Sequence, residues 1–333
     1  MKRRDFIKNA AFGSISATLG FSSYAKSSFK STGTAPLVSD PGAVSLIKGD
    51  SRTDNMYQAL TMIGEEIKQS IGNKQVIIKP NMIAFTEDFP ATHVDHLRAI
   101  LEFLKPFYNK KVIIAESSPR GAALEGFRLH GYLALAKYYN IEWQDLNDAE
   151  RYPVFILDKN GHPLRITIPK VLVDPNTYLI SAARLKTHNS VVVTLSNKNI
   201  TMGAPQIYGD QHHKRDMHQG TKEINYNLFL LTQKIPIHLA TIDGFEGMEG
   251  AGPSQGDPVN SKIAIASTDF LAADRVAVEC MDIDFRKIGY LNYCSDANMG
   301  QAELNKITLK GETIANCRKT YRLHDNINTQ LMW

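Results

Sequence analysis

Short apolar runs alternate along the chain with longer stretches in which apolar residues recur every three or four positions. The short runs predict buried β-strands, at 43–47, 76–78, 112–115, 178–181, 237–242 and 263–266. The periodic stretches predict amphipathic helices, at 53–70, 92–107, 121–139, 222–233 and 271–281. Because strands and helices alternate in this order, the pattern predicts an α/β fold with a mainly parallel sheet flanked by helices.

One part of the chain departs from this alternation. Two apolar runs, 154–157 and 164–168, flank the turn-forming residues 158–161, as in a β-hairpin. We expect this hairpin to be inserted at an edge or a face of the sheet. Among the helix ends, Gly72 is expected to end the first helix and Thr92 to cap the second.

The first 25 residues have the order of features of a twin-arginine export signal. Arg3 and Arg4 precede a short apolar stretch at 10–21 and a small-x-small cleavage site at 23–25. No stable membrane span is expected, because crossing a bilayer takes about 20 apolar residues. We expect the twin-arginine translocase to export the protein to the periplasm. The alternative is a basic N-terminal helix of a cytosolic protein.

Removal of this leader leaves a nearly neutral protein. The whole chain has a formal net charge of +4, and residues 1–25 contribute +3 of it, which leaves +1. This balance gives no support to a nucleic-acid partner. Residues 26–42 are rich in Ser, Thr, Gly and Pro and predict a flexible linker. A single α/β domain is expected over residues 43–333.

The chain has three cysteines, Cys280, Cys294 and Cys317. No two of them form a C-x-x-C pair, so the sequence contains no ligand motif for an iron–sulfur cluster or a zinc ribbon. One disulfide is compatible with an exported protein, and its pairing stays open. The alternative is that all three are buried thiols.

Polar side chains follow several of the predicted strands at their carboxyl ends. Lys79 and Asn81 follow the run at 76–78, and Glu116 follows the run at 112–115. In open α/β sheets, ligands bind beyond the carboxyl ends of the strands. We therefore expect one shared site, to which the later strands contribute Lys186, His188, Asp243 and Ser267–Asp269.

Residues 243–257 form a segment rich in glycine and acidic residues. Glycine lets the backbone approach a ligand closely, so Gly250 and Gly252 are expected to contact the substrate. The three acidic residues Asp243, Glu246 and Glu249 favour a metal, or a cationic or hydroxyl-rich ligand, over a bare phosphate. The segment matches neither a phosphate-binding loop nor a dinucleotide fingerprint. The alternative is a long surface loop.

Two further segments combine residue types that bind ligands. Residues 194–203 contain capping residues together with Lys198 and Asn199, whose longer side chains are expected to contact the ligand. Residues 212–218 are polar, and His218 is a candidate metal ligand. A solvated loop is the alternative for the second segment.

Taken together, these motifs resemble the bacterial and archaeal family called domain of unknown function 362. The resemblance covers roughly residues 76–300 and rests on Lys79-Pro80-Asn81, Leu185-Lys186-Thr187-His188, Lys198-Asn199 with Gly203, Asp243-Gly244, residues 248–253 and residues 272–277. It implies no established activity. Many members of that family carry or lie beside a ferredoxin-like iron–sulfur module, and this chain departs from them in having no cysteine cluster.

The sequence favours an enzyme that acts on a small polar or anionic substrate through a metal or acid–base groups. The expected catalytic residues are Lys186, His188, Asp243 and Glu249. The expected substrate contacts are Lys79, Asn81, Glu116, Lys198, Asn199, Gly250 and Gly252. The expected metal ligands are His188, His218 and Asp243.

Two other functions stay open at this point. One is a redox component that works with a separate electron-transfer partner, and the other is a periplasmic protein that binds a small-molecule ligand without catalysis. The cofactor is left open as well, with a divalent metal as a candidate.

Overall fold

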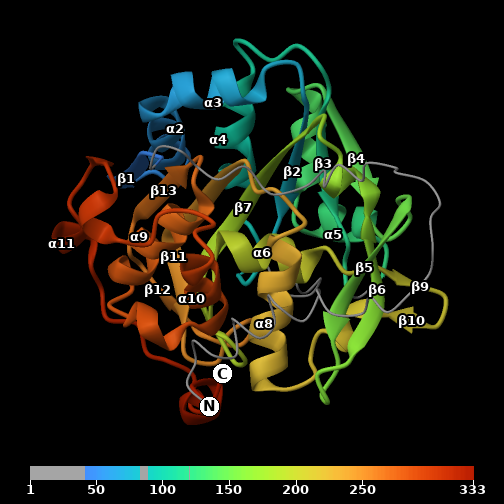
Figure 1. The fold of residues 1–333 in the computed structure, drawn as a ribbon. Helices are drawn as coiled ribbons and strands as arrows, with labels where there is room; N and C mark the ends of the chain where they lie inside the picture. Colours follow the sequence, from blue (N-terminus) through green and yellow to red (C-terminus); the bar gives the residue numbers. More distant parts are fainter. Residues whose placement is uncertain (1–41, 83–88, 120) are drawn as a thin grey trace, which may run out of the picture. The chain divides into compact units, whose positions relative to one another are not determined.

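The computed structural model describes residues 42–82, 89–119 and 121–333, and its central element is a ten-stranded sheet (Figure 1). Eight strands follow one another in the order β14-β1-β13-β11-β7-β2-β3-β4, while β8 pairs with β7 and β12 with β11. The strands are β1 (Val44–Lys48), β2 (Gln75–Pro80), β3 (Val112–Glu116), β4 (Ile141–Asp145), β7 (Thr177–His188), β8 (Val192–Thr194), β11 (Leu239–Glu249), β12 (Asp257–Val259), β13 (Ile263–Ser267) and β14 (Leu309–Gly311).

The sheet is mainly parallel. Along the eight-strand path, β13 runs antiparallel to its neighbours β1 and β11, and the other neighbours pair in parallel. The carboxyl ends of β2, β3, β7 and β11 therefore lie at the same edge. A separate antiparallel hairpin is formed by β5 (Arg151–Leu157) and β6 (Pro163–Pro169). The α/β class, the mainly parallel sheet and the hairpin predicted from the sequence are confirmed.

Helices cover both faces of the sheet. Alternate strand residues point to opposite faces, and Ile77 of β2 belongs to one cluster of buried apolar side chains whereas Val76 and Ile78 belong to the other. The helices of the first cluster are α6 (Ser196–Gly203), α8 (Thr221–Thr232), α9 (Phe270–Cys280) and α10 (Gly289–Asp296). Those of the second are α2 (Arg52–Met62), α3 (Gly64–Ile71), α4 (Val94–Leu104) and α5 (Ala123–Leu129).

Smaller elements complete the described chain. They are the two-stranded pair β9 (Ile207–Tyr208) and β10 (Gln211–His212), the one-turn helices α7 (His213–Asp216), α11 (Ile314–Cys317) and α12 (Ile327–Gln330), and 3-10 helices that include Lys170–Val173, Phe285–Lys287 and Leu304–Lys306. The three cysteines are buried and free, so no disulfide joins any of them in this structure.

Several helix ends differ from the sequence-based expectation. The first helix is broken at Ile63 into α2 and α3, and the stretch 121–139 divides into α5 and the 3-10 helix Tyr132–Lys137. Thr92 does not cap α4. The cap is His93, whose Nδ1 accepts a hydrogen bond from the backbone N–H of Asp95 at 3.1 Å.

Thr92 instead ties β2 to β7. Its hydroxyl accepts from the N–H of Asn81 and donates to the carbonyl of Ala182, both at 2.7 Å. Asn81 directly follows β2 and Ala182 lies on β7, far away in the sequence, and a local capping pattern gives no sign of either partner.

The direction of β13 corrects the predicted shared site. Because β13 is antiparallel to β11, its carboxyl end with Ser267–Asp269 lies at the opposite edge of the sheet from the ends of β2, β3 and β7. Asp269 has a structural role there, since its carboxylate accepts hydrogen bonds from the N–H groups of Leu271 and Ala272 at the start of α9.

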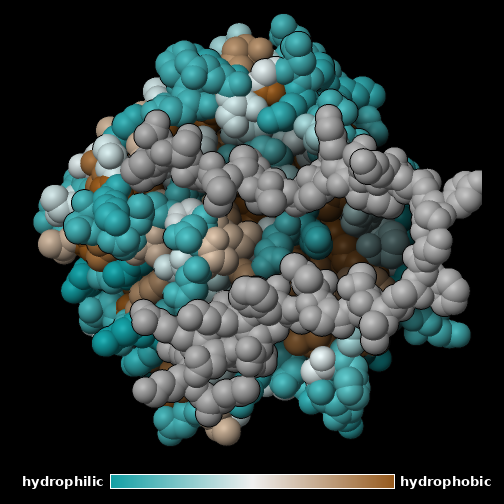
Figure 2. All heavy atoms as spheres, in the orientation of Figure 1, coloured by the Kyte–Doolittle hydropathy of each residue, from teal (hydrophilic) through white to brown (hydrophobic). Residues whose placement is uncertain are grey.

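Hydrophilic residues cover most of the outer part of the face shown in Figure 2, with hydrophobic residues visible toward its middle. Within the described residues, none of the helices combines the length and the apolar character that crossing a membrane takes. The predicted export signal at 1–25 lies outside the described residues, as does the predicted linker up to residue 41.

Candidate functional site

A cavity of about 310 Å³ lies where the carboxyl ends of β2, β3 and β7 meet α6. It contains most of the polar side chains that the sequence analysis expected at this edge. The predicted site residues that line it are Lys79, Asn81, Glu116, Lys186, His188, Lys198, Asn199 and His218.

The cavity is rich in buried positive charge. Lys79, Lys186, Lys198 and Lys214 line it, and their exposed fractions lie between 0% and 7%. Glu116 is the one carboxylate among the described residues of the lining. Burying an ammonium group is unfavourable unless it is paired and hydrogen-bonded, so the partners of each lysine decide what it can do.

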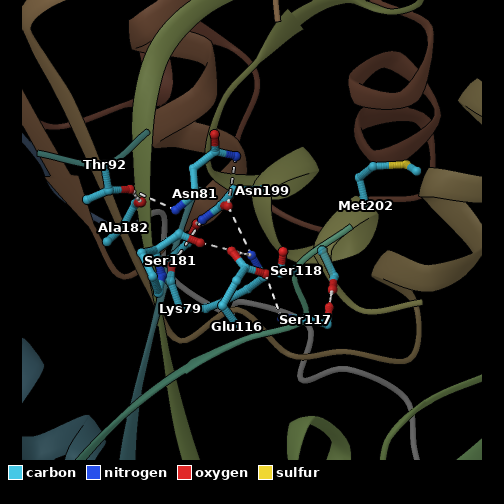
Figure 3. A network of polar contacts seen from close by, with 12 residues as sticks. Lys79, Asn81, Thr92, Glu116, Ser117, Ser118, Ser181, Ala182, Asn199 and Met202 are labelled. Carbon is cyan, nitrogen blue, oxygen red and sulfur yellow. Dashed lines mark hydrogen bonds and ion pairs between the residues drawn. The ribbon is translucent and has the colours of Figure 1, made fainter. Parts of the chain in front are cut away.

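Lys79 is fully engaged by the protein. Its Nζ donates to Glu116 Oε2 at 2.8 Å, to the carbonyl of Pro80 at 2.9 Å and to Asn199 Oδ1 at 3.3 Å (Figure 3). An ammonium group has three N–H donors, and all three are used here. A Cβ at Gly203 would collide with this side chain, which explains why a glycine ends α6 at this point.

Lys186 and Lys214 are also saturated, although by neutral acceptors. Lys186 Nζ donates to Asn81 Oδ1 at 2.8 Å and to the carbonyls of Pro90 and Pro253 at 2.9 and 3.1 Å. Lys214 Nζ donates to Ser117 Oγ at 2.9 Å, and to the carbonyls at 203 and 202 at 2.8 and 3.3 Å. These bonds fix both amino groups in place, and none of the acceptors is a carboxylate.

Lys198 differs from the other three lysines. Its Nζ has no hydrogen-bond or ion-pair partner within the part of the chain that the structure describes, yet the residue is only 4% exposed. Thr194, four residues earlier in the chain, also lines the cavity, although its hydroxyl oxygen is buried and has no partner among the described residues. The unpartnered Lys198 is a group that a bound ligand would satisfy.

The two cavity histidines present different ring atoms. The N–H of Ser190 donates to His188 Nδ1 at 3.0 Å, so a neutral His188 carries its proton on Nε2 and can donate it. His218 Nδ1 lies 3.0 Å from the carbonyl oxygen of Lys214, which can only accept. A neutral His218 therefore carries its proton on Nδ1, and its Nε2 is a proton acceptor.

Burial and mutual repulsion disfavour the charged forms of these groups. Burial lowers the pKa of Lys198 to about 7, and the charge of Lys79 adds to this effect. Burial also lowers the pKa of Lys214 to about 7 and holds the pKa of Lys186 well below its usual value. For His188, burial followed by the charge of Lys198 lowers the pKa well below the ordinary value, so the ring is neutral near pH 7.

Helix α6 is anchored so that Lys198 faces the cavity. The buried carboxylate of Asp274 on α9 accepts from the N–H groups of Ser196 and Asn197, at 2.9 and 3.0 Å, and from the Ser196 hydroxyl at 2.6 Å. Asn199 ties the next turn to the sheet, since its Nδ2 donates to the Lys79 carbonyl and to Ser181 Oγ, both at 3.1 Å (Figure 3). The N–H groups at the start of α6 are therefore bound by Asp274, and Lys198, the next residue of the helix, lines the cavity.

The structure places two of the predicted acidic residues, Asp243 and Glu249, outside the lining of the cavity. Asp243 is buried, and its Oδ2 lies 3.1 Å from Arg52 Nε. Glu249 accepts a hydrogen bond from the N–H of Arg322 at 2.9 Å. Both carboxylates thus stabilise packing against other parts of the chain.

The predicted glycines serve close packing of the chain on itself. A Cβ at Gly250 would meet the guanidinium of Arg322, and a Cβ at Gly252 would collide with the carbonyl of Thr187. The residue of this segment that reaches the cavity is Pro253, through the carbonyl that accepts from Lys186.

The three predicted metal ligands are not brought together. His188 and His218 line the cavity, whereas Asp243 pairs with Arg52 elsewhere. Over residues 42–82, 89–119 and 121–333, no three His, Cys, Asp or Glu side chains form a group that could hold a metal ion.

Lys214 and Thr194 also line the cavity but are not among the predicted site residues. Lys214 lies in the polar segment 212–218, which has the composition of a solvated loop, and Thr194 lies at the end of an apolar run. Lys214 could have been flagged by its position beside His212, His213 and His218, but nothing local indicates that its side chain is buried.

A family described as "Domain of unknown function (DUF362)" matches residues 76–279. Among solved structures, a crystal structure of a protein from Thermotoga maritima is similar at 13% sequence identity with a TM-score of 0.33, covering 61% of this chain and 52% of that one. The chain thus spans about half the length of that protein. A search of curated proteins found no match.

Proposed function

The chain belongs to the family described as a domain of unknown function (DUF362), and we propose that it is an enzyme that acts on a small anionic substrate bound in the lysine-lined cavity. The observation that carries the proposal is the charge balance of the cavity. Four buried lysines surround a single carboxylate, and Lys198 has no partner among the described residues. An anionic ligand would supply the missing charge and the missing acceptor.

Acid–base chemistry is the reaction type that this lining supports best. A neutral His188 can donate a hydrogen bond from Nε2 to a substrate oxygen and His218 can accept a proton at Nε2, because the two rings are held in opposite tautomers. Both groups lie in the same cavity as Lys198. The substrate would bind with its anionic group toward the lysines and its reacting atoms toward the imidazoles.

We also propose that the protein works in the periplasm after export by the twin-arginine translocase. Support comes from the order of Arg3, Arg4, the apolar stretch at 10–21 and the cleavage site at 23–25. A nearly neutral mature chain is consistent with a small-molecule substrate there.

The binding step is tested with a matched pair of small probes, lactate and its neutral amide, lactamide. Lactate is expected to raise the thermal unfolding midpoint in proportion to RT ln(1 + [L]/Kd), and lactamide is not. Lys198→Met is expected to lose the lactate effect. Lys159→Met, which removes an exposed lysine of the hairpin turn, is expected to keep it. Equal effects of the two probes, or none from lactate, would contradict the proposal.

A measurement of substrate turnover distinguishes an enzyme from a protein that only binds its ligand. Anions that stabilise the protein are incubated with it and followed by NMR for chemical conversion. Stabilisation by anions with no conversion of any of them would show a non-catalytic binding protein that uses the same cavity.

A further inference from the structure

We propose that Lys198 is a nucleophilic amine that forms an imine with the carbonyl carbon of a small 2-oxoacid held in the cavity. This inference rests on the proposed function, because the carboxylate of the 2-oxoacid is the anionic group that the cavity binds. It adds the chemical class of the substrate and the residue that bonds to it.

The hydrogen bonds of the cavity single out one lysine. Lys79, Lys186 and Lys214 each donate three hydrogen bonds to fixed protein acceptors. Each of them would have to give up these bonds before its nitrogen could attack a substrate. Lys198 has none to give up among the described residues, and it lines the cavity from α6.

The surroundings of Lys198 favour the neutral amine that nucleophilic attack requires. Lysine nucleophiles are activated by desolvation or by a neighbouring cation, and Lys198 has both. It is 4% exposed, and its pKa is lowered to about 7 by burial and by the charge of Lys79. At neutral pH, about half of the Lys198 side chains are therefore unprotonated.

The other lysines define what the amine can attack. The side chains of Lys186 and Lys214 are held in place by neutral acceptors, and a carboxylate bound nearby would favour their protonated forms. The Nε2–H of His188 has no partner among the described residues and can bind a carbonyl oxygen. A cavity of about 310 Å³ accommodates a small molecule, and a 2-oxoacid carries carboxylate and carbonyl on adjacent carbons.

The step is balanced without any further reactant. The lone pair of Lys198 Nζ attacks the carbonyl carbon, and a proton moves from the nitrogen to the oxygen to give a carbinolamine. The C–O bond then breaks, the oxygen leaves as water with the second hydrogen of the amine, and the C=N bond forms. No oxidation or reduction takes place.

The experiment traps this C=N bond. The full-length protein is incubated with pyruvate and sodium cyanoborohydride, which reduces an imine to a stable secondary amine, and the modified peptide is mapped by mass spectrometry. Lys198 is expected to be the main modified lysine, and an excess of lactate is expected to suppress its modification. Lactate has the same carboxylate without the carbonyl, so it competes for the cavity and forms no adduct.

Two variants and the lactate control make the outcomes distinct. Lys198→Arg keeps the charge and lacks the nucleophile, so it is expected to keep stabilisation by lactate and lose the adduct. Lys159→Arg is expected to keep both. Stabilisation by lactate without a pyruvate adduct at Lys198, or with adducts mainly at other lysines, overturns the imine and leaves the proposed function intact. No stabilisation by either acid overturns both. The wild-type mapping decides the inference even if Lys198→Arg fails to fold.

Discussion

Folding stability and anion affinity are expected to change with pH in opposite directions, because both depend on the protonation of Lys198. Its pKa in the folded protein is about 7, against an ordinary value of 10.5. Between these values the folded state holds a neutral amine while the unfolded chain still binds the proton. The unfolded state therefore binds more protons, and the free energy of unfolding rises with pH by up to about 1.4 kcal/mol per pH unit for this residue.

Binding of lactate follows the opposite trend. A simple anion is attracted by the ammonium form of Lys198, which is lost as the pH rises through about 7. The lactate affinity is therefore expected to fall by about tenfold per pH unit above that value. Above pH 7, the free energy of unfolding of the ligand-free protein is therefore expected to rise while its affinity for lactate falls.

Urea unfolding of the wild type and of Lys198→Met at pH 7, 8 and 9 measures how the free energy of unfolding rises with pH. The stability of the variant is expected to rise less steeply than that of the wild type, by about 1.4 kcal/mol per pH unit, because only the wild type loses the Lys198 proton on folding. Lys159→Met is the control: loss of this exposed lysine is expected to leave the pH dependence of the free energy of unfolding unchanged. Parallel pH profiles for wild type and Lys198→Met would refute the reasoning, since the buried amine would then contribute nothing to the linkage.

Two further predictions concern the ion pair of the cavity and the leader. Glu116→Gln is expected to lower the free energy of unfolding by about 3–5 kcal/mol, because it leaves the buried ammonium of Lys79 uncompensated. Lys79→Met combined with Glu116→Gln is expected to be less destabilised than Glu116→Gln alone, and additive losses in urea unfolding would argue against a coupled pair. Replacing Arg3 and Arg4 by Lys is expected to keep the protein in the cytoplasm, as measured by cell fractionation, and an unchanged periplasmic fraction would contradict the export proposal.

The sequence predicted the cavity residues that lie at the carboxyl ends of the parallel strands. Lys79 and Glu116 follow apolar runs at the ends of parallel strands, and the rule that such ends share one edge brings them together. The same rule placed Lys186 and His188 beyond a strand. They belong to β7 itself, which extends to His188, because the pairing with β8 continues the strand past its apolar start.

The predictions failed where a side chain depends on a distant partner. An apolar run does not show its direction, so the antiparallel β13 and the capping role of Asp269 were missed. Asp243 has the sequence context of a catalytic carboxylate, but Arg52, from the N-terminal part of the described chain, pairs with it. Lys214 likewise has acceptors just after β3 and on α6 that the local sequence does not reveal.

The buried lysines themselves argue for a function. Removing an ammonium group from water is unfavourable, and a buried ion pair is often replaceable by apolar residues without loss of stability. Folding alone would therefore be served as well by leucine or methionine at these positions. Three of the lysines reduce the unfavourable burial by donating to fixed acceptors, and Lys198 does not do so within the described residues. Burial of Lys198 without a partner is unfavourable in the ligand-free protein. It becomes favourable once a ligand bonds to the Lys198 amine. This is why we assign the chemistry of the cavity to Lys198 before any other residue.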